Sequence, residues 1–216
     1  MKESLEQKKK RSGKIIDILS REYPEAKVHL NYKNAFQLLV STILAAQCTD
    51  VLVNLVMDKL YRKYKAPADF ANQEKEVLQK ELGSISFFRN KTKSVQACCN
   101  MLIEKFNGKV PGTMEELISL PGVGRKTANV VLANCFGKPA IITDTHVIRV
   151  SGRLGFTEND NGDKVERDLM EIVPLEKQLV YSVSVGEHGR EICHARKPKC
   201  DECFVSSLCP GKGKFK

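Results

Sequence analysis

The segment LPGVGRKTANVVL, residues 120–132, combines a glycine turn with two consecutive basic residues. The pattern predicts a tight turn at the start of a helix, where backbone N–H groups lack partners and the helix dipole is positive. Gly122 and Gly124 would let the backbone approach a phosphate without a Cβ in the way, and Arg125 and Lys126 add positive charge. We therefore predict an anion site at this turn.

Lys126 has two interpretations that the turn alone does not separate. A lysine amine is a nucleophile only when neutral, and in water it is almost wholly protonated at neutral pH. Reaction at Lys126 therefore requires burial in a closed site or a nearby carboxylate that accepts the proton. Without these, the ammonium only clamps a phosphate.

A second group of residues suited to chemistry has the spacing Cys-x6-Cys-x2-Cys-x5-Cys. Four thiolates so close in sequence would repel one another unless a metal neutralised them, which indicates a metal site. Structural zinc usually pairs two short Cys-x-x-Cys knuckles, and this run has one, so a [4Fe–4S] cluster is favoured, although both centres use four cysteines. We expect His188 and His194, possible alternative ligands, to be surface groups or groups beside the ligands. The four cysteines are Cys193, Cys200, Cys203 and Cys209.

Basic residues surround the loop between the first two of these cysteines, where they form either a DNA-facing loop or a solvated basic surface. They are Arg190, Arg196, Lys197 and Lys199. Four further cysteines lie in apolar stretches and are expected to be buried free thiols. These are Cys48, Cys98, Cys99 and Cys135.

Composition narrows the class of protein. Lys and Arg outnumber Asp and Glu by 35 to 26, and the net charge of +9 suits a polyanionic partner. The basic start is followed by too short an apolar stretch for a secretion signal, and no segment approaches the roughly 18 apolar residues of a membrane span. We expect a cytoplasmic protein without membrane contact, with cysteines as thiols or metal ligands.

Helices must position these groups, because apolar residues recur at helical spacing through most of the chain. Two such stretches are Phe36, Leu39, Val40 and Ile43, and Val51, Leu52, Leu55, Val56 and Leu60. The β-branched runs at 141–143 and 147–148 are too short to change the prediction of an all-α fold. Asp144, between them, is a good N-cap for a helix that starts at Thr145.

The glycine turn itself lies between two predicted helices. Thr113 and Glu116 predict the capping box of a helix that ends near Leu120, and a second helix carries Lys126 toward Phe136. Residues 113–136 are therefore predicted to form a helix-hairpin-helix.

Four segments together resemble the endonuclease III family of DNA glycosylases: LPGVGRKTANVVL, ITDTHVIRV, LAAQCTDV, and HGREICHARKPKC leading into the four cysteines. The resemblance runs from about residue 10 to Cys209. It implies two helical domains that flank a DNA-binding cleft. One is a six-helix barrel over 28–138 with the helix-hairpin-helix at 113–136, and the other is an iron–sulfur cluster domain formed by 1–27 plus 139–216.

The resemblance also implies a reaction. Lys126 matches the lysine that attacks C1′ of the damaged nucleotide, expels the base and forms a Schiff base that leads to β-elimination of the 3′ phosphate. Asp144 matches the aspartate that stabilises positive charge on the sugar and helps proton transfer. The cofactor implied is a [4Fe–4S] cluster on the four cysteines. The implied substrate is duplex DNA with an oxidised or ring-saturated pyrimidine. We expect a monomer that is associated with the nucleoid.

Gln47 and Phe87 match residues that fill the gap left when the base is flipped out of the stack. The plainer alternatives are a polar helix-end residue for Gln47, and core positions for Phe87 and Phe88. Phe88 and Ser86 depart from the family pattern, in which tyrosine and glycine are usual, so they leave the choice of lesion open. Further DNA contacts implied by the resemblance are Gly122, Gly124, Arg125, His146, Arg149, Arg196 and Lys197.

Two alternatives remain at the level of sequence. Monofunctional mismatch glycosylases share this fold and cluster but lack a lysine at the position of Lys126 and use water as the nucleophile. A non-catalytic helix-hairpin-helix protein would bind DNA with the same turn, and would need no aspartate at position 144. A metal-dependent nuclease would need clustered carboxylates, which the sequence does not offer.

Overall fold

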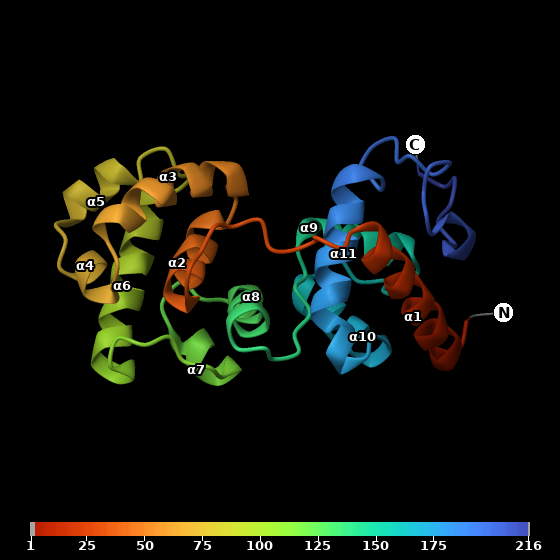
Figure 1. Ribbon diagram of the computed structural model, residues 1–216, viewed down its shortest axis with the longest axis horizontal. Coiled ribbons are helices and arrows are strands. Elements are labelled where there is room, and N and C mark those ends of the chain that lie inside the picture. Colours follow the sequence, from red (N-terminus) through yellow and green to blue (C-terminus); the bar gives the residue numbers. More distant parts are fainter. Residues whose placement is uncertain (1–2, 216) are drawn as a thin grey trace. The chain divides into compact units, whose positions relative to one another are not determined.

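The computed structural model describes residues 3–215, and within that range every regular element is a helix (Figure 1). The all-α prediction is confirmed. Contacts divide the chain into two compact units. One, here called the hairpin unit, is His29–Lys138; the other, here called the cluster unit, joins the N-terminal segment up to Val28 to the segment from Pro139 onward. No helix within the described residues is long and apolar enough to cross a membrane.

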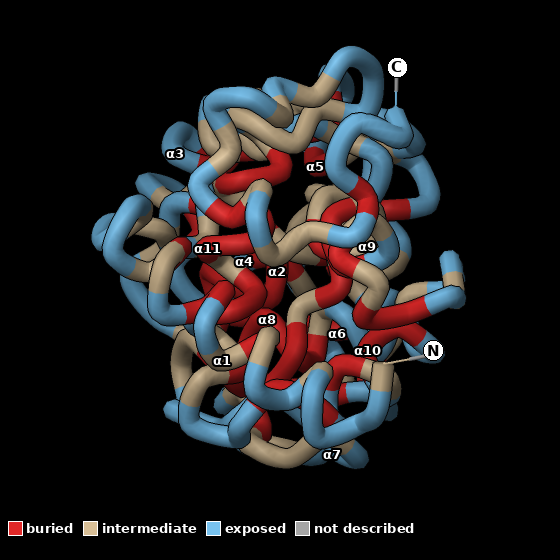
Figure 2. Tube along the Cα trace, turned by 90° about the vertical axis from the view of Figure 1, so that its right-hand side faces the viewer, coloured by how far each residue is buried: buried red, intermediate tan, exposed pale blue. Residues whose placement is uncertain are grey.

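The hairpin unit is built around α2 (Ala35–Ala45), which packs against α3, α6 and α8. Eight of its residues are buried, so this helix is apolar on almost every side, as a central helix must be (Figure 2). Phe70 joins the same core and contacts the rings of Phe36 and Tyr64. The other helices of the unit are α3 (Asp50–Lys63), α4 (Pro67–Ala71), α5 (Lys75–Glu81), α6 (Phe88–Phe106), α7 (Met114–Ser119) and α8 (Arg125–Cys135).

Only some of the regularly spaced apolar residues of α3 are buried. Val56 and Leu60 are buried, but Val51 is 79% exposed and Leu55 is 59% exposed. The face of α3 toward the core also carries Val53, so the helix is rotated relative to the stripe that its apolar residues suggest.

Two of the four cysteines predicted to be buried are buried. Burial raises the pKa of the Cys98 thiol to about 12, and it also raises that of Cys99, so both stay protonated and unreactive at neutral pH. The prediction is wrong for Cys48 and Cys135, which are half-buried. Cys135 is the last residue of α8, and Cys48 lies in the short connection between α2 and α3.

The cluster unit contains α1 (Leu5–Glu22), α9 (Thr145–Arg153), α10 (Gly162–Ile172) and α11 (Gln178–Glu191), followed by the cysteine segment. α11 packs against α1 and α9, and α1 also packs against α10. The basic start of the sequence is therefore not only a solvated surface. One face of α1 places Ile15, Ile16 and Leu19 in the core.

Arg11 fixes α1 to the later part of the cluster unit. Its Nη1 donates to the carbonyl oxygens of Leu154 at 2.7 Å and Leu208 at 3.2 Å, and its Nε and Nη2 donate to both carboxylate oxygens of Glu3. The guanidinium also lies over the ring of Phe156, 4.6 Å from its centroid. A single side chain thus joins the N-terminal helix to the segment that carries the cysteines.

Candidate functional site

The helix-hairpin-helix prediction is confirmed by α7, the turn and α8. Thr113 caps α7, and its Oγ1 accepts from the amide of Glu116 at 3.3 Å. The reciprocal half of the capping box takes another form, because the Glu116 carboxylate accepts from the Thr113 hydroxyl at 2.7 Å. Gly124 is the N-cap of α8, so Lys126 lies in its first turn, and its side chain is exposed.

The two glycines of the turn have different reasons to be glycine. Gly122 has φ +78°, and a Cβ there would lie 2.7 Å from the Cβ of Ser94 and 3.5 Å from Ile43. Gly124 has an ordinary φ of −93°, and no atom lies within 4 Å of the position of its Cβ. The sequence analysis explained both glycines by the close approach of the backbone to a phosphate. The structure explains Gly122 by packing and conformation, and leaves only Gly124 beside open space.

This difference predicts opposite outcomes for two substitutions. We expect Gly122→Ala to lower the free energy of unfolding by about 1–3 kcal/mol, because the new methyl group overlaps Ser94 in a backbone conformation that disfavours Ala. Gly124→Ser should keep stability within about 0.5 kcal/mol, since Ser is a good N-cap, while DNA binding falls. Urea denaturation and fluorescence anisotropy separate the two effects. Equal stability of both variants would contradict the assignment.

Asp144 is the N-cap of α9, as predicted, and its carboxylate has partners on two sides. Its Oδ1 accepts from the amide of Val147 at 2.7 Å, and its Oδ2 lies 3.4 Å from Nη2 of Arg190. Gly186 of α11 leaves room for this pair, because a Cβ there would come within 3.2 Å of Nη1 of Arg190. Arg190, which the sequence placed among the candidate DNA-facing charges, is thus paired with Asp144 and lies 3.7 Å from Glu187.

His146 and Arg149 follow Asp144 on α9 and contact each other, with 3.1 Å between Nδ1 and Nη2. Arg149 also donates to the carbonyl oxygens of Gly189 at 2.7 Å and Cys193 at 3.1 Å, and so joins α9 to the end of α11. Burial lowers the pKa of His146, which favours the neutral ring at neutral pH. Through these contacts both side chains stabilise the packing of the cluster unit.

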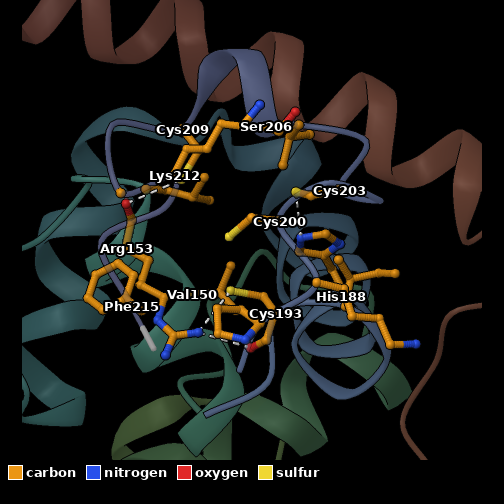
Figure 3. A pocket seen from close by; sticks show the side chains of 16 residues that line it. Val150, Arg153, His188, Cys193, Cys200, Cys203, Ser206, Cys209, Lys212 and Phe215 are labelled. Carbon is orange, nitrogen blue, oxygen red and sulfur yellow. Dashed lines mark hydrogen bonds between the residues drawn. The ribbon is translucent and has the colours of Figure 1, made fainter. Parts of the chain in front are cut away.

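The four C-terminal cysteines line one pocket of the cluster unit (Figure 3). Cys193 accepts from Nη1 of Arg153 at 3.3 Å, and Cys209 lies 3.5 Å from the Arg153 carbonyl oxygen. Cys203 lies 3.5 Å from Nε2 of His188. All four are free thiols, and they approach the pocket from different sides.

The donor set of this pocket suits an iron–sulfur cluster. Burial raises the pKa of Cys203 and Cys209, and the charges of neighbouring cysteines raise it further, so the thiolates require a positively charged partner. A single zinc ion needs its sulfur ligands about 3.8 Å from one another. Within residues 3–215 no group of three or more His, Cys, Asp or Glu is close enough to hold one ion. Sulfurs arranged around a wider pocket fit a cluster of several metal atoms.

His188 meets one of the two alternatives expected from the sequence, because it lies beside a cysteine ligand. His188 is 1% exposed, so it is not a surface group, and burial lowers its pKa to about 4, which keeps the ring neutral. It lies between Cys203 and the hydroxyl of Tyr23, which is 3.4 Å from its Nδ1. His194 is half-buried, and its carbonyl oxygen accepts from Arg153 at 2.6 Å.

Backbone conformation marks three of the residues that the resemblance assigned to DNA. Among residues 3–215, the non-glycine residues with positive φ are Gln47, Phe87, Asn107 and Lys197, at 53°, 57°, 52° and 50°. Asn107 ends α6, a position where asparagine tolerates this conformation. The other three are exposed, and Phe87 is 64% exposed, so it is not a core residue. Strained backbone of this kind concentrates at functional sites.

Sequence reasoning missed Arg153 and Lys91, whose hydrogen-bond partners are distant in the chain. Arg153 holds the cysteine segment through the carbonyl oxygens of residues 193–195, and Lys91 holds the end of α2. The sequence signal for Arg153 is its place in the last turn of α9, where a cation is favourable.

Comparison with known proteins shows which family shares this arrangement. Residues 40–175 match the family model of the HhH-GPD superfamily base excision DNA repair protein, and residues 193–209 match the iron-sulfur binding domain of endonuclease III. Endonuclease III of Synechocystis sp. is 47% identical over 94% of this chain and 93% of its own, and that of Bacillus subtilis is 46% identical over 90% and 89%. A trapped covalent complex of endonuclease III with DNA superposes with a TM-score of 0.91 at 43% identity, covering 95% of this chain and 97% of the other.

The hairpin, the helical fold and the cysteine segment together define a base excision DNA repair protein of the helix-hairpin-helix class. Within that class, the chain belongs to the endonuclease III family. It is a DNA glycosylase and AP lyase with a [4Fe–4S] cofactor.

The cysteine pocket yields a prediction on cofactor retention. We expect Cys203→Ser to lose the broad visible absorbance of the cluster and to unfold at a lower temperature, because the remaining buried thiols lose the partner that neutralises them. Cys98→Ser, a buried cysteine of the hairpin unit, is the matched control and should keep its iron content. Equal iron content in the Cys203 variant and the wild type, measured by absorbance and iron assay, would contradict this role.

Proposed function

We propose that this protein removes oxidised or ring-saturated pyrimidines from duplex DNA and then cleaves the strand by β-elimination through a Schiff base on Lys126. The observation that carries the proposal is the place of Lys126, exposed in the first turn of α8 directly after the glycine turn. An amine in the first turn of α8 lies beside the free backbone amides of the helix start, which attract the DNA phosphate. Family membership supports a lysine nucleophile over water.

In this proposal Lys126 attacks C1′, the base leaves, and the amine forms an imine with the opened sugar. Asp144 stabilises the positive charge on the sugar and accepts the proton that the amine loses. The two bonds that hold its carboxylate, to the Val147 amide and to Arg190, support this assignment, because they fix one orientation. Lys126 belongs to the hairpin unit and Asp144 to the cluster unit, so the reaction requires both.

The DNA contacts proposed are Gln47, Phe87, Gly124, Arg125, Arg196 and Lys197, with Gly122, His146 and Arg149 contributing through the conformation of their segments. Gln47 and Phe87 fill the space vacated by the flipped nucleotide, and their exposure supports that role. Arg196 and Lys197 are exposed on the loop between the first two cysteines. Cys193, Cys200, Cys203 and Cys209 are the proposed ligands of the [4Fe–4S] cluster, which holds this loop in shape.

We further infer that the hairpin unit corresponds to the barrel domain, expected at 28–138, and the cluster unit to the cluster domain, expected at 1–27 plus 139–216. The contacts support this division to within one residue, because they divide the chain after Val28 and after Lys138. The protein acts as a monomer in the cytoplasm, associated with the nucleoid. Its net charge of +9 supports attraction to DNA.

A lesion panel with reductive trapping tests the proposal. The protein is incubated with duplexes that contain one thymine glycol, 5-hydroxycytosine, 8-oxoguanine or no lesion, with and without borohydride. We expect base release and a covalent protein–DNA band with the pyrimidine lesions only. Base release without a band would indicate a water nucleophile, and DNA binding without release or band would indicate a non-catalytic protein.

A further inference from the structure

Lys91 is a buried cation that the reaction outlined above does not use. Lys91 is 7% exposed, and its Nζ donates to the carbonyl oxygens of Leu44 at 2.8 Å and Ala46 at 2.5 Å. No other lysine or arginine in the part of the chain that the structure describes is buried. Removing an ammonium from water is costly unless it gains good hydrogen bonds. Its contacts therefore require an explanation.

The two carbonyl groups belong to the end of α2. That helix ends at Ala45, and Ala46 is its C-cap. The last carbonyls of a helix have no intrahelical partner and carry the negative end of the dipole, so an ammonium is well placed there. The next residue is Gln47, exposed and with φ 53°. Lys91 thus fixes the chain immediately before Gln47.

The backbone of Lys91 holds a second loop. Lys91 lies in the first turn of α6, and its amide donates to the carbonyl oxygen of Phe87 at 3.1 Å. Phe87 is the N-cap of α6, with φ 57° and a side chain that gives it no capping bond. The path of the chain at Phe87 therefore depends on this first turn.

One residue consequently connects both loops, with its backbone bound to Phe87 and its ammonium bound beside Gln47. Each loop tip is a non-glycine residue in the left-handed region, a backbone conformation that side chains with a Cβ rarely adopt. Such conformations persist only where the surroundings hold them firmly. For Gln47 that support comes from the buried ammonium, and for Phe87 it comes from the first turn of α6, in which Lys91 lies.

We propose that Lys91 is a positioning residue that sets the separation of Gln47 and Phe87, and so controls how they fill the gap left by a flipped nucleotide. The inference rests on the proposed function, in which these two side chains contact DNA. Lys91 is buried within the hairpin unit, and the proposal gives it no contact with DNA or with the reacting sugar. It therefore acts on extraction of the base from the stack, before the chemistry at Lys126.

The test compares Lys91→Met with the wild type on two DNA probes under single-turnover conditions. One is a duplex with one thymine glycol, and the other is a single strand with one abasic site, which has no stacked base to extract. We expect excision from the duplex to slow roughly 10- to 100-fold, as for a misplaced binding group, while cleavage of the single strand is unchanged. A 2-aminopurine beside the lesion should show slower unstacking in the variant.

Two variants complete the design. Lys93→Met removes an exposed lysine of the same helix and should behave as the wild type. Lys91→Arg keeps a charged donor and should recover most of the duplex excision. If Lys91→Met fails to fold, as judged by circular dichroism, Lys91→Gln retains N–H donors and replaces it in both assays.

Wild-type excision by a folded Lys91→Met or Lys91→Gln protein would overturn the proposal. An equal loss on the duplex and the single strand would also overturn it, because that pattern reports general damage to the fold. A wild-type protein that forms no borohydride-trapped complex with the abasic strand would overturn the proposed function itself. The two failures are thereby distinguishable.

Discussion

Lys126→Gln is expected to abolish the covalent protein–DNA complex and to slow strand cleavage by roughly 10⁴-fold or more, because it removes the amine proposed to form the imine. Glutamine keeps a polar side chain of similar length in the first turn of α8, so the helix and its amides are preserved. DNA binding should weaken only modestly, since one of several phosphate-facing charges is lost. The measurement is borohydride trapping on a thymine glycol duplex, with anisotropy for binding.

The matched control is Lys105→Gln, which removes an exposed lysine from the end of α6 in the same unit. It should trap and cleave as the wild type does. Retention of the trapped complex by Lys126→Gln would transfer the nucleophile to another amine. Loss of binding in parallel with cleavage would instead make Lys126 a phosphate clamp.

Asp144→Asn is expected to slow base release by roughly 10²- to 10⁴-fold, the range typical of a lost proton-transfer group. The thermal stability should change little, because asparagine caps helices as well as aspartate and can still accept from the Val147 amide. The lost ion pair with Arg190 is partly exposed and spans 3.4 Å, so it adds only a small term. Single-turnover base release and thermal melting are the two measurements.

Asp144→Ala separates capping from chemistry. It should lose as much activity as Asp144→Asn and, in addition, about 1 kcal/mol of stability from the missing cap. An Asp144→Asn protein that releases base at the wild-type rate would reduce Asp144 to a helix cap. A destabilised Asp144→Asn protein would show that the charge, and not the cap, holds the start of α9.

Local signals predicted the elements that carry the site. The glycine turn, the N-cap at Asp144 and the T-x-x-E start of α7 each depend on residues within one helical turn, so they can be read from sequence. The packing of individual residues within these elements is harder to predict from the sequence. Nothing local shows that Gly122 packs on Ser94 while Gly124 faces open space. That distinction arises from contacts 28 residues apart in the chain.

Long-range polar contacts could not be predicted from the sequence for the same reason. Lys91 reaches carbonyl groups 45 and 47 residues away, and Arg153 reaches those of the cysteine segment 40–42 residues away. Each looks like an ordinary charged residue on a helix. Val51 shows the converse, since it is an apolar residue at helical spacing and is nevertheless 79% exposed. Spacing gives a helix its period, whereas its partners decide which face is buried.

The division of the chain has a consequence for its synthesis on the ribosome. The hairpin unit is continuous, so it can fold as soon as residue 138 has emerged. α1 is made first, yet Ile15, Ile16 and Leu19 share a core with Tyr181 and Val185 of α11. At 5–20 residues per second this apolar face waits roughly 10 to 30 s for its partners. During that interval the apolar face of α1 lacks the partners that bury it in the folded protein.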